Sequence, residues 1–346
     1  MTTRPVFAER FSSQALAGPP LRDPTAVVER LLAVQGQDPR GARLALRVRT
    51  GGLTAADVDR ALSEERSLLI TWLNRGTLHL VRSEDYPWLQ ALTTPQLLTS
   101  ARRRLAHEDV PAEVGERGVA VIERALADEG PLTRLQLRER LESAGLPTHG
   151  QTLIHLLFLS GVRGVTVRGP MVGKHHAYVL ARDWLGPARP VDRGAALAEL
   201  ARRYLVGHAP ADDRDLARWA GLPLRDARAG LEAIASELVE REDGLLHRAA
   251  RPPEAGVPGP RLLGAFDPVL LGWRSREAIL GPHTQLVTTN GIFRPFAMVG
   301  GRAAGTWKLN RGKVTIEPLG RIGKQANAAL AADASDVERF MSSGSN

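Results

Sequence analysis

The chain has 346 residues, 43% hydrophobic and 24% charged, and no apolar run long enough to cross a bilayer, which argues against a membrane protein. It contains no cysteine, so disulfides, iron–sulfur clusters and cysteine zinc sites are excluded. Its net charge of +8 favours a polyanionic partner such as nucleic acid. Nearly all of that charge is arginine, which a GC-rich genome would also produce.

The sequence shows neither a metal-ligand motif nor a secretory signal. The nine histidines show no metal-ligand spacing such as HExxH, and the adjacent pair His175-His176 is interpreted as part of a turn or wing. The segment Met1 to Pro20 lacks the basic-then-apolar arrangement of a secretory signal. We therefore expect a cytoplasmic, nucleoid-associated protein.

A helix is predicted from Asp23 to Asp38, because apolar residues recur at helical spacing in its first part (Val27, Val28, Leu31 and Leu32). Gln35 continues that stripe and should face the core or a cleft, where its amide needs partners. Gln37 lies two positions further, and residues two apart do not share a helix face. The two amides converge only if the helix loosens, for which Gly36 and Pro39 give a reason.

A second helix is predicted from Arg40 to Arg49. Asp38 makes a good N-cap for it, with Pro39 at its first position, so a structural role for this carboxylate is favoured over a catalytic one. Arg40, Arg43 and Arg47 fall on one side, where they suit a DNA backbone or form a solvated face. The run Arg102-Arg103-Arg104 has the same two interpretations, a charged surface first and a phosphate clamp second.

A weak repeat occurs three times along the chain: a capped helix start, helical sequence and short β-rich pieces. The caps are Thr54, Thr133 and one of the aspartates Asp212 and Asp213. In the first repeat, Leu68 to Leu73 should pair with Thr77 to Val81 across the turn Asn74-Arg75-Gly76. Helix, turn, helix and hairpin is the order of a winged helix.

Linker composition at Gly186 to Pro190 and at Arg251 to Pro260 suggests domain boundaries. Beyond Pro260, apolar runs at residues 285–289, 296–299 and 313–317 predict a small β-barrel or sheet closed by a C-terminal helix. The predicted fold is α+β: three tandem winged-helix units followed by a small β-barrel-like domain. The four domains are residues 1–110, 111–186, 187–255 and 256–346.

Four stretches together resemble the AlkZ/YcaQ family of winged-helix DNA glycosylases. They are Val34 to Arg40 (VQGQDPR), Trp72 to Val81 (WLNRGTLHLV), Phe266 to Leu271 (FDPVLL) and Asn290-Gly291-Ile292. The resemblance runs from about Val27 to Leu309. The two-glutamine motif resembles the AlkZ branch, whereas the YcaQ branch has an aspartate at the position of Gln37.

The resemblance implies excision of bulky or crosslinking N7-alkylguanine adducts from double-stranded DNA by a monomer, without a metal or organic cofactor. Gln35 and Gln37 become the catalytic pair. The segment Asn290 to Arg294 corresponds to an inserting hairpin, so Asn290 and Arg294 join Arg40, Arg43, Arg47 and Arg75 as expected DNA contacts. His79 is interpreted as a structural imidazole rather than a proton shuttle.

The chemistry suits such a pair. Alkylation at N7 makes guanine a cationic leaving group, so the enzyme has to place a water and stabilise charge on the sugar. No lysine lies near the motif, which predicts a monofunctional glycosylase. Two alternatives are a transcriptional regulator or architectural DNA binder without catalysis, and a protein-interaction scaffold.

Overall fold

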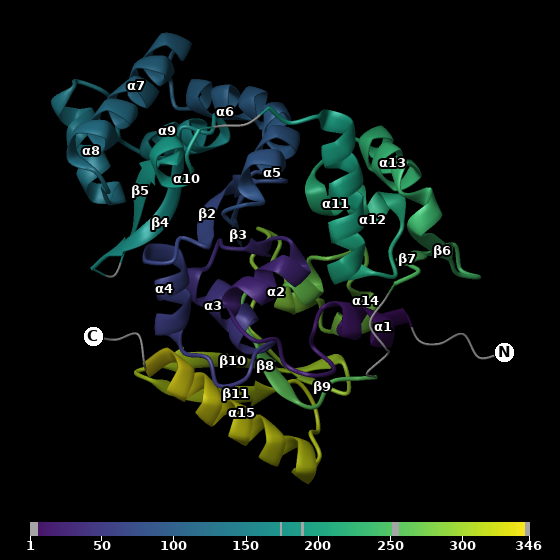
Figure 1. Cartoon of the computed structure of the whole chain (residues 1–346). Helices are drawn as coiled ribbons and strands as arrows, with labels where there is room; N and C mark the ends of the chain where they lie inside the picture. Colours follow the sequence, from purple (N-terminus) through teal and green to yellow (C-terminus); the bar gives the residue numbers. More distant parts are fainter. Residues whose placement is uncertain (1–5, 174, 188–189, 251–255, 343–346) are drawn as a thin grey trace. The chain divides into compact units, whose positions relative to one another are not determined.

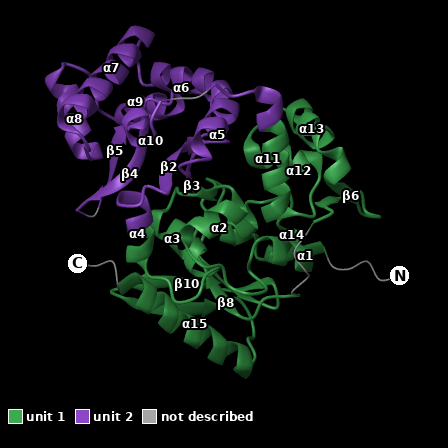
Figure 2. Ribbon diagram, viewed as in Figure 1, with its two compact units in different colours: residues 1–58, 197–346 green, residues 59–196 purple. Residues whose placement is uncertain are grey.

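The computed structural model describes residues 6–173, 175–187, 190–250 and 256–342 (Figure 1). Helices and strands are mixed along the chain, which confirms the expected mixed class. Within these residues, no helix is both long and apolar enough to cross a membrane. The chain divides into two compact units, which we call unit 1 (residues 1–58 and 197–346) and unit 2 (residues 59–196) (Figure 2).

The two units group the chain differently from the four domains that the sequence suggested. Residues 1–110, the first predicted domain, contribute to both units. The finer division therefore stays a prediction. Of the two predicted linkers, residues 188–189 and 251–255 lie outside the described part of the chain.

Unit 2 contains most of the second predicted repeat and the hairpin of the first. Its helices are α5 (Tyr86–Thr93), α6 (Pro95–His107), α7 (Ala112–Glu129), α8 (Arg134–Ser143), α9 (Thr152–Val162) and α10 (Ala181–Leu185). Its strands are β2 (Leu68–Leu73), β3 (Thr77–Arg82), β4 (Thr166–Val172) and β5 (His175–Leu180), neighbours in the order β3-β2-β4-β5. Helix α4 (Ala55–Ser63) crosses the boundary between the units along the sequence.

The predicted first hairpin is confirmed. Strands β2 and β3 pair antiparallel from Leu68 opposite Arg82 to Leu73 opposite Thr77. The turn between them needs two residues with positive φ, and Asn74 (55°) and Gly76 (79°) supply them. These turn residues agree with the register that the sequence predicted.

The second repeat has the predicted order of two helices and two strands, α8, α9, β4 and β5, and α7 precedes it. Thr133 caps α8 through a capping box with Gln136, as its sequence indicates. Helix α9 is buried over nearly its whole length and packs into a core with Trp72, Leu105 and Tyr178. His175 and His176 begin β5 opposite Val172 and Met171, in agreement with their expected place in a wing.

Unit 1 is built from both ends of the chain. Its helices are α1 (Val6–Ser13), α2 (Pro24–Leu31), α3 (Pro39–Arg47), α11 (Arg193–His208), α12 (Asp213–Ala220), α13 (Leu224–Ala233), α14 (Glu277–Leu280) and α15 (Lys324–Ser342). Its strands are β1 (Val34–Gln35), β6 (Leu238–Glu240), β7 (Leu246–Arg248), β8 (Arg261–Leu263), β9 (Phe296–Val299), β10 (Arg302–Asn310) and β11 (Lys313–Pro318). In the third repeat, Asp212 caps α12 by accepting from the Asp215 amide at 2.6 Å, and β6 and β7 form the hairpin.

The C-terminal β structure is an open sheet, so the predicted barrel is wrong for the described residues. The strand order is β11-β10-β9-β8, which leaves β8 and β11 as edges. Helix α15 packs on the sheet through Leu330, Val337 and Phe340, and this closing helix was predicted. Strand β10 was not predicted, because its segment RAAGTWKLN is rich in small residues and poor in β-branched residues.

The predicted strand at residues 285–289 is also wrong. A short 3-10 helix spans Thr284–Leu286, and a single bridge joins Val287 to Phe293. This bridge closes a loop rather than extending the sheet.

Candidate active site

The helix before the glutamine motif ends earlier than predicted. Helix α2 begins after its cap Asp23 and stops at Leu31, because Leu32 has a φ of 65° that a helix cannot accept. Residues 31–34 are all buried. A continuous apolar run does not distinguish a helix from an extended segment, which explains why the sequence predicted a helix as far as Asp38.

Because α2 ends at Leu31, Gln35 and Gln37 lie outside the helix and differ in exposure. Gln35 ends the short strand β1 and is only 7% exposed, whereas Gln37 is exposed. Strand β1 ends at Gln35, and Gln37 lies in a bend before α3, so the two glutamines do not belong to a helix. One amide then belongs to the buried interior and the other reaches solvent.

Helix α3 holds the end of the motif. The Asp38 carboxylate accepts a hydrogen bond from the Gly41 amide at 2.7 Å, and Pro39 occupies the first helical position. The predicted N-cap is confirmed.

The three arginines of α3 differ in exposure. Arg40 is exposed, but Arg43 is 8% and Arg47 only 3% exposed. The Arg47 guanidinium donates to Asp333 at 3.0 Å, to Asp336 at 2.8 Å and to the Leu262 carbonyl at 3.1 Å. The expected phosphate contacts of Arg43 and Arg47 do not agree with this burial, and Arg40 is the exposed arginine of this helix.

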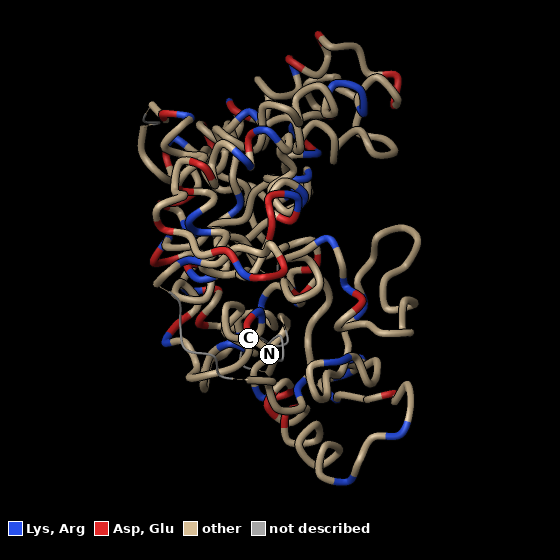
Figure 3. Tube along the Cα trace, turned by 90° about the vertical axis from the view of Figure 1, so that its right-hand side faces the viewer, with Lys and Arg blue, Asp and Glu red and all other residues tan. Residues whose placement is uncertain are grey.

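Outside α3, the predicted run Arg102-Arg103-Arg104 lies on α6 with all three residues exposed. Figure 3 shows acidic and basic residues interspersed along the trace. Many arginines have acidic neighbours, for example Arg202 with Glu199 at 2.6 Å and Glu237 at 2.8 Å. The net charge of +8 is therefore distributed over the surface.

The back of α3 packs tightly on the segment Gly264 to Asp267. A Cβ atom at Gly41 would lie 2.3 Å from the Ala265 carbonyl oxygen, and one at Gly264 would lie 3.0 Å from the Gly41 carbonyl oxygen. Glycine is required at this close approach. The helix that follows the glutamine motif is thus fixed against a segment more than two hundred residues later in the chain.

A buried ion pair secures the same contact. Arg49 and Asp267 are both 0% exposed, and their side chains form two hydrogen bonds of 2.9 and 3.0 Å. Arg49 also donates to the Gln14 and Ala45 carbonyls at 2.8 Å each. Asp267 caps a 3-10 helix through the Val269 amide at 3.0 Å. In the sequence, the Phe266-Asp267-Pro268 stretch was notable only because of the family resemblance. No sequence pattern indicated that Asp267 pairs with Arg49.

The expected hairpin around Asn290 is a narrow, exposed loop. The Thr288 amide donates to the Ile292 carbonyl at 2.9 Å, the Gly291 amide donates to Thr288, and Gly291 has a φ of 73°. Asn290 and Arg294 are exposed, and Ile292 is 53% exposed although it is apolar. The loop therefore presents polar side chains beside one apolar side chain at a tight turn.

In unit 2, Arg75 is half-buried in the β2–β3 turn and His79 lies on β3. His79 is 3% exposed, and its Nδ1 lies 2.9 Å from the Thr77 carbonyl. Burial, with help from the charge of Arg75, lowers the pKa of His79 to about 3. The imidazole is therefore neutral at pH 7, with Nδ1–H as the donor to Thr77. This agrees with a structural histidine and not with a proton donor.

We predict that two buried histidines destabilise the protein in mild acid. Burial lowers the pKa of His208, as of His79, to about 3 from an ordinary 6.5. Below pH 6.5 the unfolded chain takes up protons that the folded chain refuses, so the free energy of unfolding should fall by about 1.4 kcal/mol per pH unit for each histidine.

Urea unfolding between pH 6.5 and 5 measures this slope. His79→Gln should reduce it, and His149→Gln, at an exposed position, should leave it unchanged. An unchanged slope in His79→Gln would contradict the assignment.

Comparison with known proteins agrees with this architecture. Residues 28–340 match the AlkZ-like DNA glycosylase family. An interstrand DNA cross-link repair glycosylase of Streptomyces sahachiroi is 28% identical to this chain. The alignment covers 97% of this chain and 95% of that protein. The structure of the Streptomyces sahachiroi DNA glycosylase AlkZ is similar with a TM-score of 0.76 at 24% identity, over 96% of each chain. The chain therefore belongs to the AlkZ-like family and is a DNA glycosylase.

Proposed function

We propose that this glycosylase hydrolyses the N-glycosidic bond of bulky or crosslinked N7-alkylguanine in double-stranded DNA, with Gln35 and Gln37 as its catalytic pair. The observation that carries the proposal is the non-helical motif before α3, in which Gln35 at the end of β1 is buried and Gln37 is exposed. The relative from Streptomyces sahachiroi is named for interstrand cross-link repair. A role in self-resistance to a DNA-alkylating product fits the same lesions.

In this reaction the protein has to position a water molecule and stabilise the charge that develops on the sugar. The glycosidic bond breaks through an oxocarbenium-like state and the alkylated base leaves as a neutral molecule. Water then adds to the sugar carbon and releases one proton to the solvent. Amide oxygens of Gln35 and Gln37 orient that water and stabilise the developing positive charge. A neutral amide is a weaker proton acceptor than a carboxylate, so the reaction is limited to leaving groups that are already activated.

The fold supports DNA binding through three tandem winged helices, which we infer from the repeated order of helices and hairpins. Arg40, Arg75, Asn290 and Arg294 are the contacts we retain. Ile292 at the tip of its loop suits insertion between bases, since minor-groove proteins use apolar side chains in this way. The protein acts as a monomer in this proposal.

The reaction should release the base without cutting the strand. Lys308 is paired with Glu317 at 2.7 Å and Lys313 with Glu338 at 2.9 Å, on strands β10 and β11. Neither lysine lies in the glutamine motif, so a Schiff base with the sugar is not expected.

An excision assay tests the proposal. Duplex oligonucleotides with a small, a bulky or a crosslinked N7-alkylguanine are incubated with the protein, and the released base and the abasic sites are measured. We expect base release, with strand breaks only after alkali. No release from any of the three substrates would refute the proposed lesion class, and breaks without alkali would contradict the monofunctional mechanism.

A further inference from the structure

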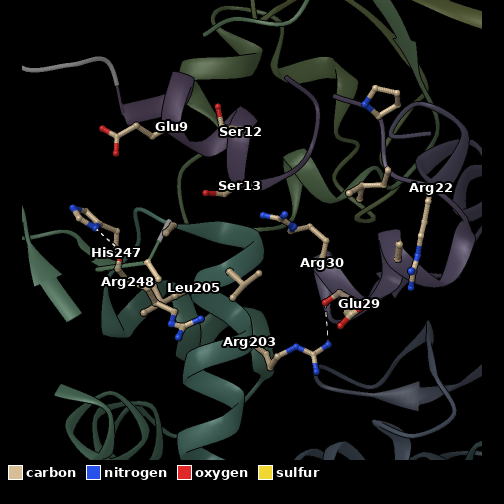
Figure 4. Close-up of a pocket in the computed structure, with 16 residues that line it drawn as sticks. Glu9, Ser12, Ser13, Arg22, Glu29, Arg30, Arg203, Leu205, His247 and Arg248 are labelled. Atoms are coloured by element: carbon tan, nitrogen blue, oxygen red, sulfur yellow. Dashed lines mark hydrogen bonds between the residues drawn. The ribbon is translucent and has the colours of Figure 1, made fainter. Parts of the chain in front are cut away.

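Unit 1 contains a pocket of about 930 Å³ that the glutamine motif does not use. Residues of α1, α2, α11 and the segment around β7 line it (Figure 4). Its volume lies in the range of pockets that bind small molecules, roughly 300 to 1,000 Å³. Its lining includes four arginines, Arg22, Arg30, Arg203 and Arg248, and two glutamates, Glu9 and Glu29.

Arg30 differs from the other three arginines. Arg22 pairs with Asp23 at 2.9 Å, Arg248 pairs with Glu237 at 3.0 Å, and Arg203 donates to the Glu29 carbonyl at 2.9 Å. Within the described residues, the Arg30 guanidinium has neither an ion pair nor a hydrogen bond, and Glu29 next to it acts only through its field. Burial lowers the pKa of Arg30 because it removes water from the charged group.

The backbone of Arg30 is held firmly while its side chain enters the pocket. Helix α11 approaches α2 at Gly207, where a Cβ atom would lie 2.3 Å from the Arg30 carbonyl oxygen. Figure 4 shows the Arg30 guanidinium extending toward the side of the pocket that Ser13 lines. The Glu9 carboxylate is already engaged by Arg241, so it does not neutralise Arg30.

We propose that this pocket binds a phosphate group, with Arg30 as its charged partner and Ser13 as a hydroxyl donor. A partly desolvated guanidinium without a hydrogen-bonded carboxylate loses hydration that the field of Glu29 offsets only in part, and a bound anion restores that loss. Guanidinium geometry matches two oxygens of one phosphate. The site does not depend on the role of the glutamines.

Phosphate could come from two sources with the same chemistry. One is a phosphodiester of the DNA on which the glycosylase acts, and the other is a free phosphate compound such as a nucleoside monophosphate. A site for free phosphate compounds binds a small phosphate anion on its own, whereas a site for a DNA phosphodiester binds the duplex. Titration of each ligand distinguishes the two sources.

The test compares three full-length proteins: the natural chain, Arg30→Gln and Arg225→Gln. Arg225 is 86% exposed on α13, also in unit 1, and its substitution makes the same change of charge outside the pocket. Pyrophosphate, deoxyguanosine monophosphate and an undamaged duplex are each titrated in by calorimetry, and thermal unfolding checks the fold. A second variant, Ser13→Ala, removes only the hydroxyl.

We expect Arg30→Gln to weaken binding about tenfold, the loss typical of one charged hydrogen bond, while Arg225→Gln changes it less than twofold. Weaker binding of the two small anions identifies a free phosphate ligand, and weaker binding of the duplex alone identifies a DNA phosphate. If each of the three ligands binds Arg30→Gln as tightly as it binds the natural chain, the proposed site is wrong. Excision by Gln37→Ala, measured separately, reports on the glutamines and not on this pocket.

Discussion

Replacing Gln37 with alanine is expected to lower the excision rate at least about 100-fold, the effect of removing one preorganised polar group from an active site. Gln37 is exposed in the bend between β1, which ends at the buried Gln35, and α3, and its amide can orient the attacking water. DNA affinity should stay within a few fold, because an amide that positions water adds little to phosphate binding. Single-turnover excision of an N7-alkylguanine duplex and equilibrium DNA binding measure the two effects.

Two further variants sharpen this experiment. Gln325→Ala removes an exposed amide from α15 in the same unit and should excise normally. Gln37→Asp restores an oxygen acceptor, as in the YcaQ-like motif, and should keep activity on methyl-sized lesions. Normal excision by Gln37→Ala would show that the catalytic pair has been assigned incorrectly.

Asp267→Asn is expected to lower the free energy of unfolding by about 3–5 kcal/mol, because it leaves the Arg49 charge buried without its partner. Both side chains are 0% exposed, so water cannot replace the lost carboxylate. Urea unfolding followed by circular dichroism measures the loss. Excision should fall with the folded fraction, since Asp267 holds the segment against which α3 packs.

The matched control is an ion pair in solvent. Lys308 and Glu317 lie 2.7 Å apart but are 65% and 60% exposed, so Glu317→Gln should leave stability unchanged within error. The double variant Arg49→Met/Asp267→Leu should lower the free energy of unfolding by less than the sum of the losses in the single variants Arg49→Met and Asp267→Leu. Equal losses for Asp267→Asn and Glu317→Gln would mean that the buried pair contributes no more than a surface pair.

Local chemistry made much of the fold predictable. The caps Asp38, Thr133 and Asp212 act within three residues of themselves, so short sequence patterns contain all the information they need. The β2–β3 hairpin was predictable for the same reason, since its turn needs positive φ at Asn74 and Gly76. The family was visible in four short motifs and required no knowledge of packing.

The site was predictable in its residues but not in its geometry. Leu32 ends α2 with a positive φ that a leucine rarely adopts, and only the surrounding core can impose it. Helix periodicity placed Arg47 on a surface, but Asp333 and Asp336 of α15 enclose it. Strand β10 depends on pairing with β9 and β11 rather than on its own propensity.

The sequence by itself determined the capped helices, the first hairpin, the mixed class and the family of this glycosylase. Tertiary structure alone decided where α2 stops, which arginines of α3 reach solvent, and which residue neutralises Asp267. Arg49 and Asp267 are 218 positions apart, so no local pattern joins them. The physical reason is the same in each case: turns and caps are closed by neighbouring residues, whereas burial and charge pairing depend on which distant segments fold together.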